Sequence, residues 1–356
     1  MSQLETALIY DPICLEHDTG GAHVERPQRL AAILDALTRY HLAEAGDYLA
    51  PPDATIEQLA RVHDADYIRQ VESISGMGGR WMDIDTVISP HSWAAALKAA
   101  GAAVLGVDLL LSGARQTAFA IARPPGHHAN ANHAGGFCIF NNAAVAAAHA
   151  LANGIERVLI VDWDVHHGNG TQDIFYRDPR VLYFSAHEYP FYPGSGGMHE
   201  RGSGAGRGYT LNIPLPHGVG DDGYLQVWRD ILAPAATRYR PQLVIISAGY
   251  DAHRADPIAY MNLTARGYHQ LASIVREIDA QHCDGRVLAV LEGGYNLSAL
   301  GDSVAATLFA LNGLPLPKAI DEQRNIDEER FVPVWAAEAP NIDQLVAEVE
   351  RLHGLK

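Results

Sequence analysis

Five short apolar segments, each followed at once by polar or glycine-rich residues, constrain the fold of this chain more than any other feature. They are residues 118–122, 158–161, 181–184, 243–246 and 287–291. Because the segments are unbroken rather than alternating, they are typical of strands that are buried on both faces of a parallel sheet. Ligands bind beyond the carboxyl ends of such strands, so we expect the motifs that follow the five segments to meet at one site.

Helical patterns alternate with these segments. They cover residues 27–40, 91–111, 141–152, 222–239, 264–280 and 297–311, and a last one covers residues 341–352. This alternation predicts right-handed crossovers and an α/β fold, with a mostly parallel central sheet and helices on both faces. The motifs that must cooperate extend from residue 127 to residue 295 without a linker, so we expect residues 1–356 to form a single domain.

The net charge of the chain indicates which kinds of molecule it can bind. The chain carries a formal net charge of −16 and has no basic tract, so we expect no direct contact with nucleic acid. An acidic protein attracts a cationic substrate or a basic protein tail. Alternatively, the acidity only keeps a cytoplasmic protein soluble.

Cysteine usage and apolar stretches indicate the compartment. Cys14, Cys138 and Cys283 are widely spaced and form no CxxC pattern, which indicates neither a disulfide framework nor a thiolate zinc site. The first residues lack the basic start and apolar core of a signal peptide. The most apolar stretch, residues 94–111, is interrupted by Lys98 and Asp108 and predicts a buried helix instead of a membrane span. We therefore expect a cytoplasmic protein without a membrane segment.

Three residues form a candidate metal site. Asp164 and His166 are separated by one residue just after an apolar segment, so both side chains point to the same face of an extended chain. Asp251 follows another segment and offers a third ligand, which leaves positions open as in catalytic zinc sites. Iron(II) or cobalt(II) also suits these ligands, although zinc is the first expectation. Neither HExxH nor GxSxG occurs, which favours water activated by a metal over a serine nucleophile. Alternatively, residues 164–167 form a polar turn and Asp251 caps a helix.

A pair of histidines is the candidate for proton transfer. His127 and His128 follow a turn that the preceding Pro-Pro-Gly stiffens. One imidazole can take a proton from the attacking water and pass it to the leaving amine. Asp162 and Asn169 flank the metal ligands and can orient the two rings, and a carboxylate raises basicity more than an amide does. We expect different roles for the two histidines, unless they are ordinary loop residues.

Tyr295 is the candidate oxyanion donor. It follows Gly293 and Gly294, whose missing side chains allow substrate to approach and leave the hydroxyl free to point into a cleft. The alternative is a core tyrosine with a satisfied hydroxyl.

These motifs resemble the histone deacetylase family. The most specific matches are residues 123–128, 135–141, 162–172 and 291–296, within a resemblance that covers roughly residues 20 to 312. The sequence of residues 162–172 resembles that of the class II branch, which includes bacterial histone-deacetylase-like amidohydrolases. The resemblance implies the arginase/deacetylase-like fold, a C-terminal extension at residues 313–356 and, by analogy, a homo-oligomer.

The resemblance also implies a role for each matching residue. The zinc ligands would be Asp164, His166 and Asp251. His128, paired with Asn169, would be the general base and acid, whereas His127, paired with Asp162, would act electrostatically. Tyr295 would polarise the acetamide together with the metal. The residues that would line the substrate tunnel are Gly136, Phe137, Tyr192 and Ile258. Potassium would be bound through Asp162, Asp164, His166, Ser185 and Ala186, and a second potassium through Phe175, Asp178, Val181 and Tyr209.

The implied reaction is hydrolysis of an N-acetyl amide to an amine and acetate. Polyamine-preferring class II relatives carry a glutamate where this chain has Ile258, which cannot form an ion pair with a distant ammonium. Acetyl-lysine in proteins or peptides is therefore favoured over acetylpolyamines. A ureohydrolase of the related arginase-type fold would need two metals. A non-catalytic acetyl-lysine binder would be expected to lack Tyr295, a metal ligand or the histidine pair, all of which are present.

Overall fold

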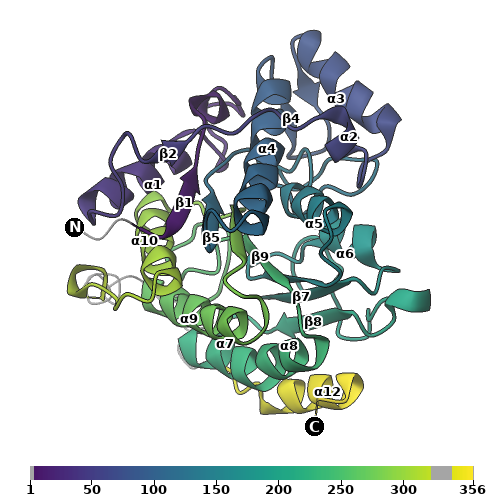
Figure 1. Ribbon diagram of the computed structural model, residues 1–356, viewed down its shortest axis with the longest axis vertical. Helices are drawn as coiled ribbons and strands as arrows, with labels where there is room; N and C mark the ends of the chain where they lie inside the picture. Colours follow the sequence, from purple (N-terminus) through teal and green to yellow (C-terminus); the bar gives the residue numbers. More distant parts are fainter. Residues whose placement is uncertain (1–3, 322–338, 356) are drawn as a thin grey trace.

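The fold is built on one parallel sheet of eight strands in the order β2-β1-β5-β10-β9-β6-β7-β8 (Figure 1). The computed structural model describes residues 4–321 and 339–355, so residues 322–338 and 356 of the predicted C-terminal extension lie outside the described residues. The strands are β1 Thr6–Ile9, β2 Tyr48–Leu49, β5 Thr117–Ala120, β6 Val158–Asp162, β7 Val181–Glu188, β8 Thr210–Leu215, β9 Leu243–Ala248 and β10 Val287–Leu291. A separate antiparallel pair joins β3 Arg80–Trp81 to β4 Val87–Ile88. The predicted α/β fold with a parallel sheet is confirmed.

The five predicted strands are neighbours in the middle of the sheet. They are β5, β10, β9, β6 and β7, and every residue of β6, β7, β9 and β10 is buried. Burial on both faces explains why their sequences are apolar without alternation. Strands β2, β1 and β8, which the sequence analysis did not predict, form the two edges. The loops that follow the five central strands therefore lie side by side at one end of the sheet, the end at which the parallel strands have their carboxyl termini.

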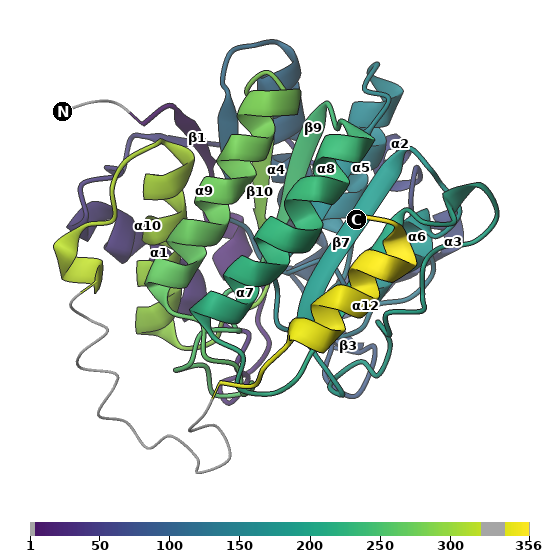
Figure 2. The same ribbon diagram turned by 90° about the horizontal axis from the view of Figure 1, so that it is seen from below.

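Helices cover both faces of the sheet (Figures 1 and 2). On one face, α4 packs on β5 and β10 and α5 packs on β6 and β9; on the other, α9 packs on β9 and against α10 and α7. The helices are α1 Gln28–Arg39, α2 Ile56–Leu59, α3 Ala65–Gly76, α4 Ser92–Leu111, α5 Asn142–Ala152, α6 Asn169–Phe175, α7 Asp221–Val227, α8 Ala233–Tyr239, α9 Ala265–His282, α10 Leu297–Leu311 and α12 Asp343–His353.

The helix predicted at residues 222–239 is not a regular α-helix. Between α7 and α8 the chain forms one π-helical turn, η3, at Trp228–Leu232. Pro234 follows this turn, and a proline inside a helix cannot donate its backbone hydrogen bond, which favours such a local widening. The C-terminal α12 packs on η3 and on the edge strand β8, and thus covers an edge of the sheet (Figure 2).

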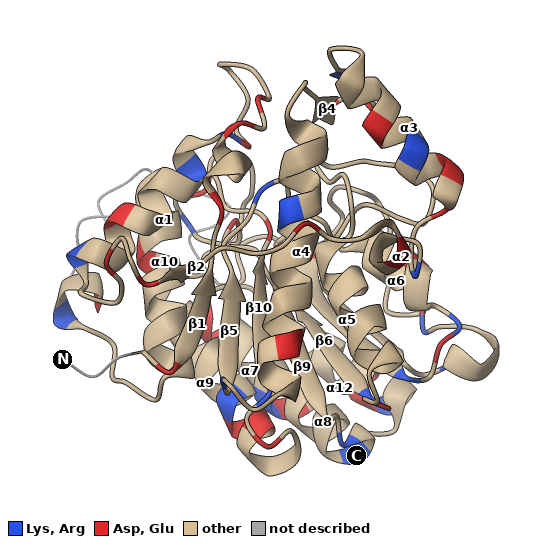
Figure 3. Cartoon of the chain, turned by 45° about the horizontal axis from the view of Figure 1, so that its top comes forward, with Lys and Arg blue, Asp and Glu red and all other residues tan. Residues whose placement is uncertain are grey.

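Helix α4 is long and apolar enough to cross a membrane by length and composition, and 61% of its most apolar window is buried inside the protein. It packs against β1, β5, β10 and α5. Lys98 and Asp108 are its charged residues, and Figure 3 shows one basic and one acidic position along it. Packing in the core accounts for the apolar composition, as predicted for this stretch.

Asparagine caps begin two of the helices that follow site loops. Asn141 accepts a hydrogen bond from Ala144 N at the start of α5, and Asn296 accepts one from Ala299 N at the start of α10. Such caps satisfy backbone amides that have no partner within the helix. The caps fix where the loop of the histidine pair and the loop of Tyr295 end.

Candidate active site

The side chains predicted for metal binding and catalysis meet at the carboxyl ends of four of the central strands. His127 and His128 follow β5, Tyr295 follows β10, Asp251 follows β9, and Asp164 follows β6. Residues that are more than 100 positions apart in the chain are therefore brought into one buried group, as the parallel sheet predicts.

Asp164, His166 and Asp251 form a buried group whose ligand atoms all lie within 4.8 Å of one another. His166 Nδ1 lies 3.1 Å from Asp164 Oδ1 and 3.2 Å from Asp251 Oδ2. Although Asp251 Oδ2 is buried, it accepts no hydrogen bond of suitable geometry from the described residues. A buried carboxylate oxygen without a donor is costly unless a cation neutralises it. The group therefore fits a zinc ion, for which two carboxylates and one imidazole are suitable ligands.

Backbone amides hold the two carboxylates in place. Asp164 Oδ1 accepts from His166 N at 2.9 Å, its Oδ2 accepts from Gly293 N at 2.8 Å, and Asp251 Oδ1 accepts from Val165 N at 2.8 Å. A Cβ atom at Gly293 would lie 2.2 Å from Asp251 Oδ2, so only glycine allows the β10 loop to approach the metal group this closely.

The two histidines have different partners. His127 Nδ1 lies 3.1 Å from Asp162 Oδ2, whereas His128 Nδ1 lies 2.8 Å from Asn169 Oδ1. Burial opposes the charge on His127, but the carboxylates of Asp164 and Asp162 raise its pKa well above the usual value. Burial and the neighbouring His127 lower the pKa of His128 well below the usual value. The pair therefore combines a charged ring with a neutral one.

Glu292 fixes the turn that carries the histidines. Its Oε2 accepts from Gly126 N at 2.6 Å and from His127 N at 3.1 Å, and burial raises the pKa of this carboxyl to about 7. The sequence analysis noted Glu292 in a motif but gave it no role. A glutamate directly after five apolar strand residues was the available signal.

Tyr295 is buried against two side chains from other loops. Its ring centroid lies 5.8 Å from that of Phe137 and 5.0 Å from the Arg29 guanidinium carbon. Its backbone N donates to Asp256 Oδ2 at 2.8 Å. Burial and the Asp251 carboxylate raise the pKa of the Tyr295 hydroxyl well above the usual value, so the hydroxyl stays protonated and able to donate.

Arg29 and Asp256 support this loop and were missed by the sequence analysis. Arg29 Nε donates to Gly294 O at 2.7 Å, and Nη2 donates to Glu292 O at 2.5 Å. Burial and Asp251 raise the pKa of Asp256 to about 8, while the backbone amides of Ile258 and Tyr295 oppose this shift. Neither role has a local sequence pattern, because both depend on contacts with distant segments.

Two of the residues predicted to line the substrate tunnel, Gly136 and Tyr192, lie next to His128. A Cβ atom at Gly136 would lie 2.3 Å from His128 Cδ2, and Tyr192, which is 41% exposed, has its ring centroid 5.1 Å from that of His128. Phe137 adopts a left-handed φ of 69°, which is uncommon for a bulky residue and typical of functional sites. Ile258 is half-buried on the loop after Asp251.

The residues predicted for the first potassium site also lie together. Asp162 and Ser185 are direct partners in the register of β6 and β7, and Ala186 follows. The Tyr183 hydroxyl donates to Asp162 Oδ2 at 2.9 Å, and Ser185 Oγ lies 2.9 Å from His187 Nδ1. Two hydrogen-bonded pairs of side chains, Tyr183 with Asp162 and Ser185 with His187, thus lie within this group.

The residues predicted for the second potassium surround the start of β7. Asp178 N donates to Phe175 O at 3.0 Å, Val181 N donates to Asp178 O at 3.4 Å, and Tyr209 directly precedes β8, which pairs with β7. The Asp178 carboxylate is engaged by Arg180, at 2.9 and 2.6 Å.

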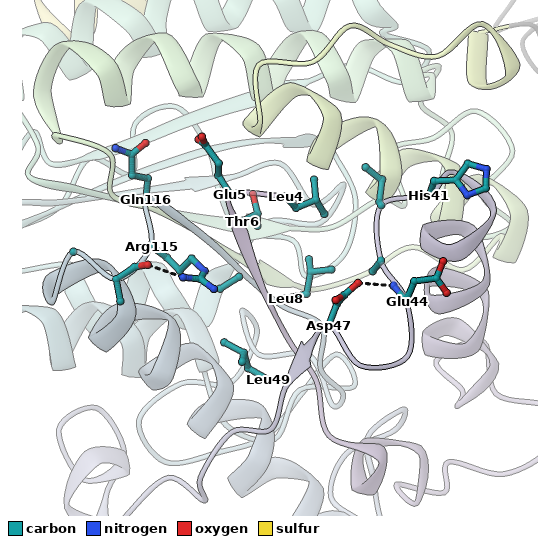
Figure 4. Close-up of a pocket in the computed structure, with 15 residues that line it drawn as sticks. Leu4, Glu5, Thr6, Leu8, His41, Glu44, Asp47, Leu49, Arg115 and Gln116 are labelled. Carbon is teal, nitrogen blue, oxygen red and sulfur yellow. Dashed lines mark hydrogen bonds between the residues drawn. The ribbon is translucent and has the colours of Figure 1, made fainter. Parts of the chain in front are cut away.

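Figure 4 shows a surface pocket of about 670 Å³. It is lined by residues at the amino ends of β1, β2 and β5, among them Thr6, Asp47 and Gln116. In a parallel sheet the amino ends lie opposite the carboxyl ends that carry the metal group. This pocket is therefore not part of the candidate active site.

Comparisons with known proteins agree with this geometry. Residues 23–311 match the model of the histone deacetylase domain. A probable deacetylase from Archaeoglobus fulgidus is 40% identical over 98% of this chain and 97% of its own length. A histone deacetylase-like amidohydrolase from Pseudomonas aeruginosa is 38% identical over 87% of this chain and 86% of its own length. The crystal structure of the HDA15 HD domain matches with a TM-score of 0.85 at 36% identity, covering 99% of this chain and 95% of that one.

The fold, the site and these relatives define a hydrolase of the deacetylase and amidohydrolase class. The chain belongs to the histone deacetylase family. The family predicted from the motifs is thus confirmed. The substrate is not settled by the relatives, because polyamine deacetylase HDAC10 from Homo sapiens is also 39% identical over 88% of this chain and 49% of its own length.

Proposed function

We propose that this protein is a zinc-dependent deacetylase that hydrolyses N-acetyl amides, with acetyl-lysine in proteins or peptides as the preferred substrate. The observation that carries the proposal is the buried group of Asp164, His166 and Asp251 beside the histidine pair, with the orphaned oxygen of Asp251. When bound there, zinc would polarise the acetamide carbonyl and lower the pKa of a water molecule.

His128 is the residue suited to move the proton. Its Nδ1 faces Asn169 Oδ1, which accepts a hydrogen bond, so the ring proton lies on Nδ1 and the lone pair on Nε2. Because its lowered pKa keeps the ring neutral, Nε2 can take a proton from the attacking water and then give it to the leaving amine. His127, held by Asp162, would provide positive charge next to the reacting group.

Tyr295 is suited to stabilise the negative charge that develops on the acetamide oxygen. The ring is held by Phe137 and Arg29, and no described residue accepts a hydrogen bond from its hydroxyl. A donor that is already oriented loses little entropy when charge develops, and this makes such donors effective.

Other parts of the proposal rest on sequence and resemblance. They are potassium at the group of Asp162 and Ser185, a cytoplasmic location, a homo-oligomeric assembly and the absence of nucleic-acid and membrane partners. Iron(II) remains an alternative to zinc for the same ligands.

The second candidate substrate is an acetylpolyamine, because a polyamine deacetylase is among the relatives. Ile258 argues against it, since an apolar side chain at the entrance offers no charge to a distant ammonium.

The test compares kcat/KM of the zinc-loaded protein on an acetyl-lysine peptide and on acetylspermidine. Asp164→Ala is the metal-site control, and metal content is measured on both proteins. We expect a preference for the peptide, and Ile258→Glu should shift the ratio towards acetylspermidine. A strong preference of the wild type for acetylspermidine would make the polyamine the substrate, and activity retained by metal-free Asp164→Ala would exclude the proposed chemistry.

A further inference from the structure

Asp256 joins two loops of the active site through one buried carboxylate. Its Oδ1 accepts from Ile258 N at 3.0 Å, within the loop that follows β9. Its Oδ2 accepts from Tyr295 N at 2.8 Å, in the loop that follows β10. The side chain is 8% exposed, so water does not replace either contact easily.

The backbone of Tyr295 needs such support. It follows Gly293 and Gly294, and Gly294 adopts a φ of 112° that few other residues tolerate. Two glycines leave the direction of the following residue weakly defined by the local chain. The direction in which the Tyr295 side chain points therefore depends on contacts with other segments.

A second contact from the same segment acts on the next residue. Asn296 Nδ2 donates to Ala255 O at 3.0 Å, while Asn296 Oδ1 caps α10 by accepting from Ala299 N at 3.0 Å. Consecutive residues of the β9 loop thus hold consecutive residues of the β10 loop. The cap anchors one side of Tyr295, and Asp256 anchors the amide on the other side.

We propose that Asp256 is a positioning residue, which fixes the backbone of Tyr295 so that its hydroxyl meets the acetamide oxygen. This role rests on the proposed deacetylase function. The same carboxylate shapes the turn at Ile258, so the oxyanion donor and one wall of the substrate entrance share a single support. Both oxygens of the Asp256 carboxyl group accept a backbone N–H, whereas an asparagine would turn an NH₂ group towards one of the two amides.

The test is a double-mutant cycle that combines Asp256→Asn with Tyr295→Phe, assayed with zinc-loaded protein and the acetyl-lysine peptide. We expect Asp256→Asn alone to lower kcat about 10- to 100-fold, with KM changed less than about threefold, because a displaced donor affects the transition state more than binding. In the Tyr295→Phe background the same substitution should cost less than about threefold, because the hydroxyl that it positions is already absent.

Asp279→Asn is the matched control. Asp279 is 7% exposed and its Oδ1 accepts from Arg286 N at 2.7 Å, but it lies in the last turn of α9, and Arg286 directly precedes the amino end of β10. The same chemical change at the opposite end of the sheet should lower Tm without lowering kcat. If Asp256→Asn does not fold, Asn296→Asp removes the bond to Ala255 and keeps a capping oxygen. It should show a smaller loss of kcat that also disappears in the Tyr295→Phe background.

Two outcomes overturn the proposal and are distinguishable. Wild-type protein that is inactive on both the peptide and acetylspermidine overturns the proposed function and this role with it. An active wild type with additive losses in the cycle, or with full kcat in Asp256→Asn, overturns the role of Asp256 alone.

Discussion

Replacing Glu25 by glutamine should destabilise the protein strongly at neutral pH and progressively less as the pH falls towards about 2. The Glu25 carboxylate is completely buried between Arg29, at 3.0 Å, and Arg123, whose Nη2 lies 2.7 Å from Oε2. Arg123 also donates to Cys14 O, and Arg29 also donates to Gly294 O beside Tyr295. Among the residues that the structure describes, Glu25 is the only carboxylate paired with these two guanidinium groups, so it provides their compensating charge.

The magnitude follows from the pKa of the carboxyl. Burial alone would raise it, but Arg123 and then Arg29 outweigh burial and lower the pKa of Glu25 from 4.5 to about 2. Because the folded-state pKa is depressed, the stabilisation is fully present above about pH 4.5 and is lost as the pH falls towards about 2. At about 1.36 kcal/mol per pKa unit, the contribution is about 3 kcal/mol. Breaking a buried pair usually costs a similar amount, about 3–5 kcal/mol.

Denaturant unfolding of metal-free protein between pH 7 and pH 3 tests this reasoning. The free energy of unfolding of Glu25→Gln should lie about 3 kcal/mol below that of the wild type at pH 7, and the difference should shrink as the pH falls. Asp35→Asn is the control, because Asp35 pairs with Arg39 on the surface, with side chains 77% and 47% exposed. It should change stability by less than about 0.5 kcal/mol. A difference for Glu25→Gln that is independent of pH, or below about 1 kcal/mol at pH 7, would refute the argument.

Four further predictions concern the active site. Tyr295→Phe should keep its zinc, measured by metal analysis, and lose about 10²–10³ in kcat; a kcat near that of the wild type would exclude the oxyanion role. His128→Ala should lose about 10²–10⁴ in kcat, which single-substrate kinetics will show. Asp251→Asn should abolish the rise in Tm that zinc gives to the wild type. Gly136→Ala should lower activity far more than Gly113→Ala, since both have positive φ but only Gly136 would place a Cβ 2.3 Å from His128; equal effects would contradict this.

The centre of the fold could be predicted from sequence because burial on both faces leaves a direct trace. Each central strand contains an apolar run that leads into a polar motif, and in β7 the motif at residues 185–187 lies within the strand. The motifs meet because the carboxyl ends of parallel strands lie at the same end of the sheet. The edge strands leave less trace. Strand β2 has only two residues, too few to form a recognisable pattern. In β8, Asn212 and Pro214 interrupt the apolar pattern. An edge strand tolerates proline because its backbone nitrogen need not donate a hydrogen bond to a neighbouring strand.

The residues of the candidate site also fall into those that the sequence identified and those that it did not. Asp164, His166 and the histidine pair could be identified because their partners are adjacent in the sequence or share its motifs. Glu25 and Arg123 are 98 residues apart, and Asp256 acts on a residue 39 positions away. For such residues the sequence shows only an ordinary acid or base in a loop. Their importance arises from the packing that removes water from around them.

Substrate preference is the hardest property to infer from the sequence for a related reason. In the proposed mechanism the metal group, His128 and Tyr295 act on the acetamide, which acetyl-lysine and acetylpolyamines share. We therefore expect discrimination between the two substrates to come from the proposed entrance, where Tyr192 is exposed and Ile258 is half-buried. Because Asp256 holds both Ile258 and Tyr295, the entrance and the oxyanion donor are mechanically connected. A change that alters the loop of Ile258 should then affect turnover as well as selectivity, so the two properties are not expected to vary independently in this protein.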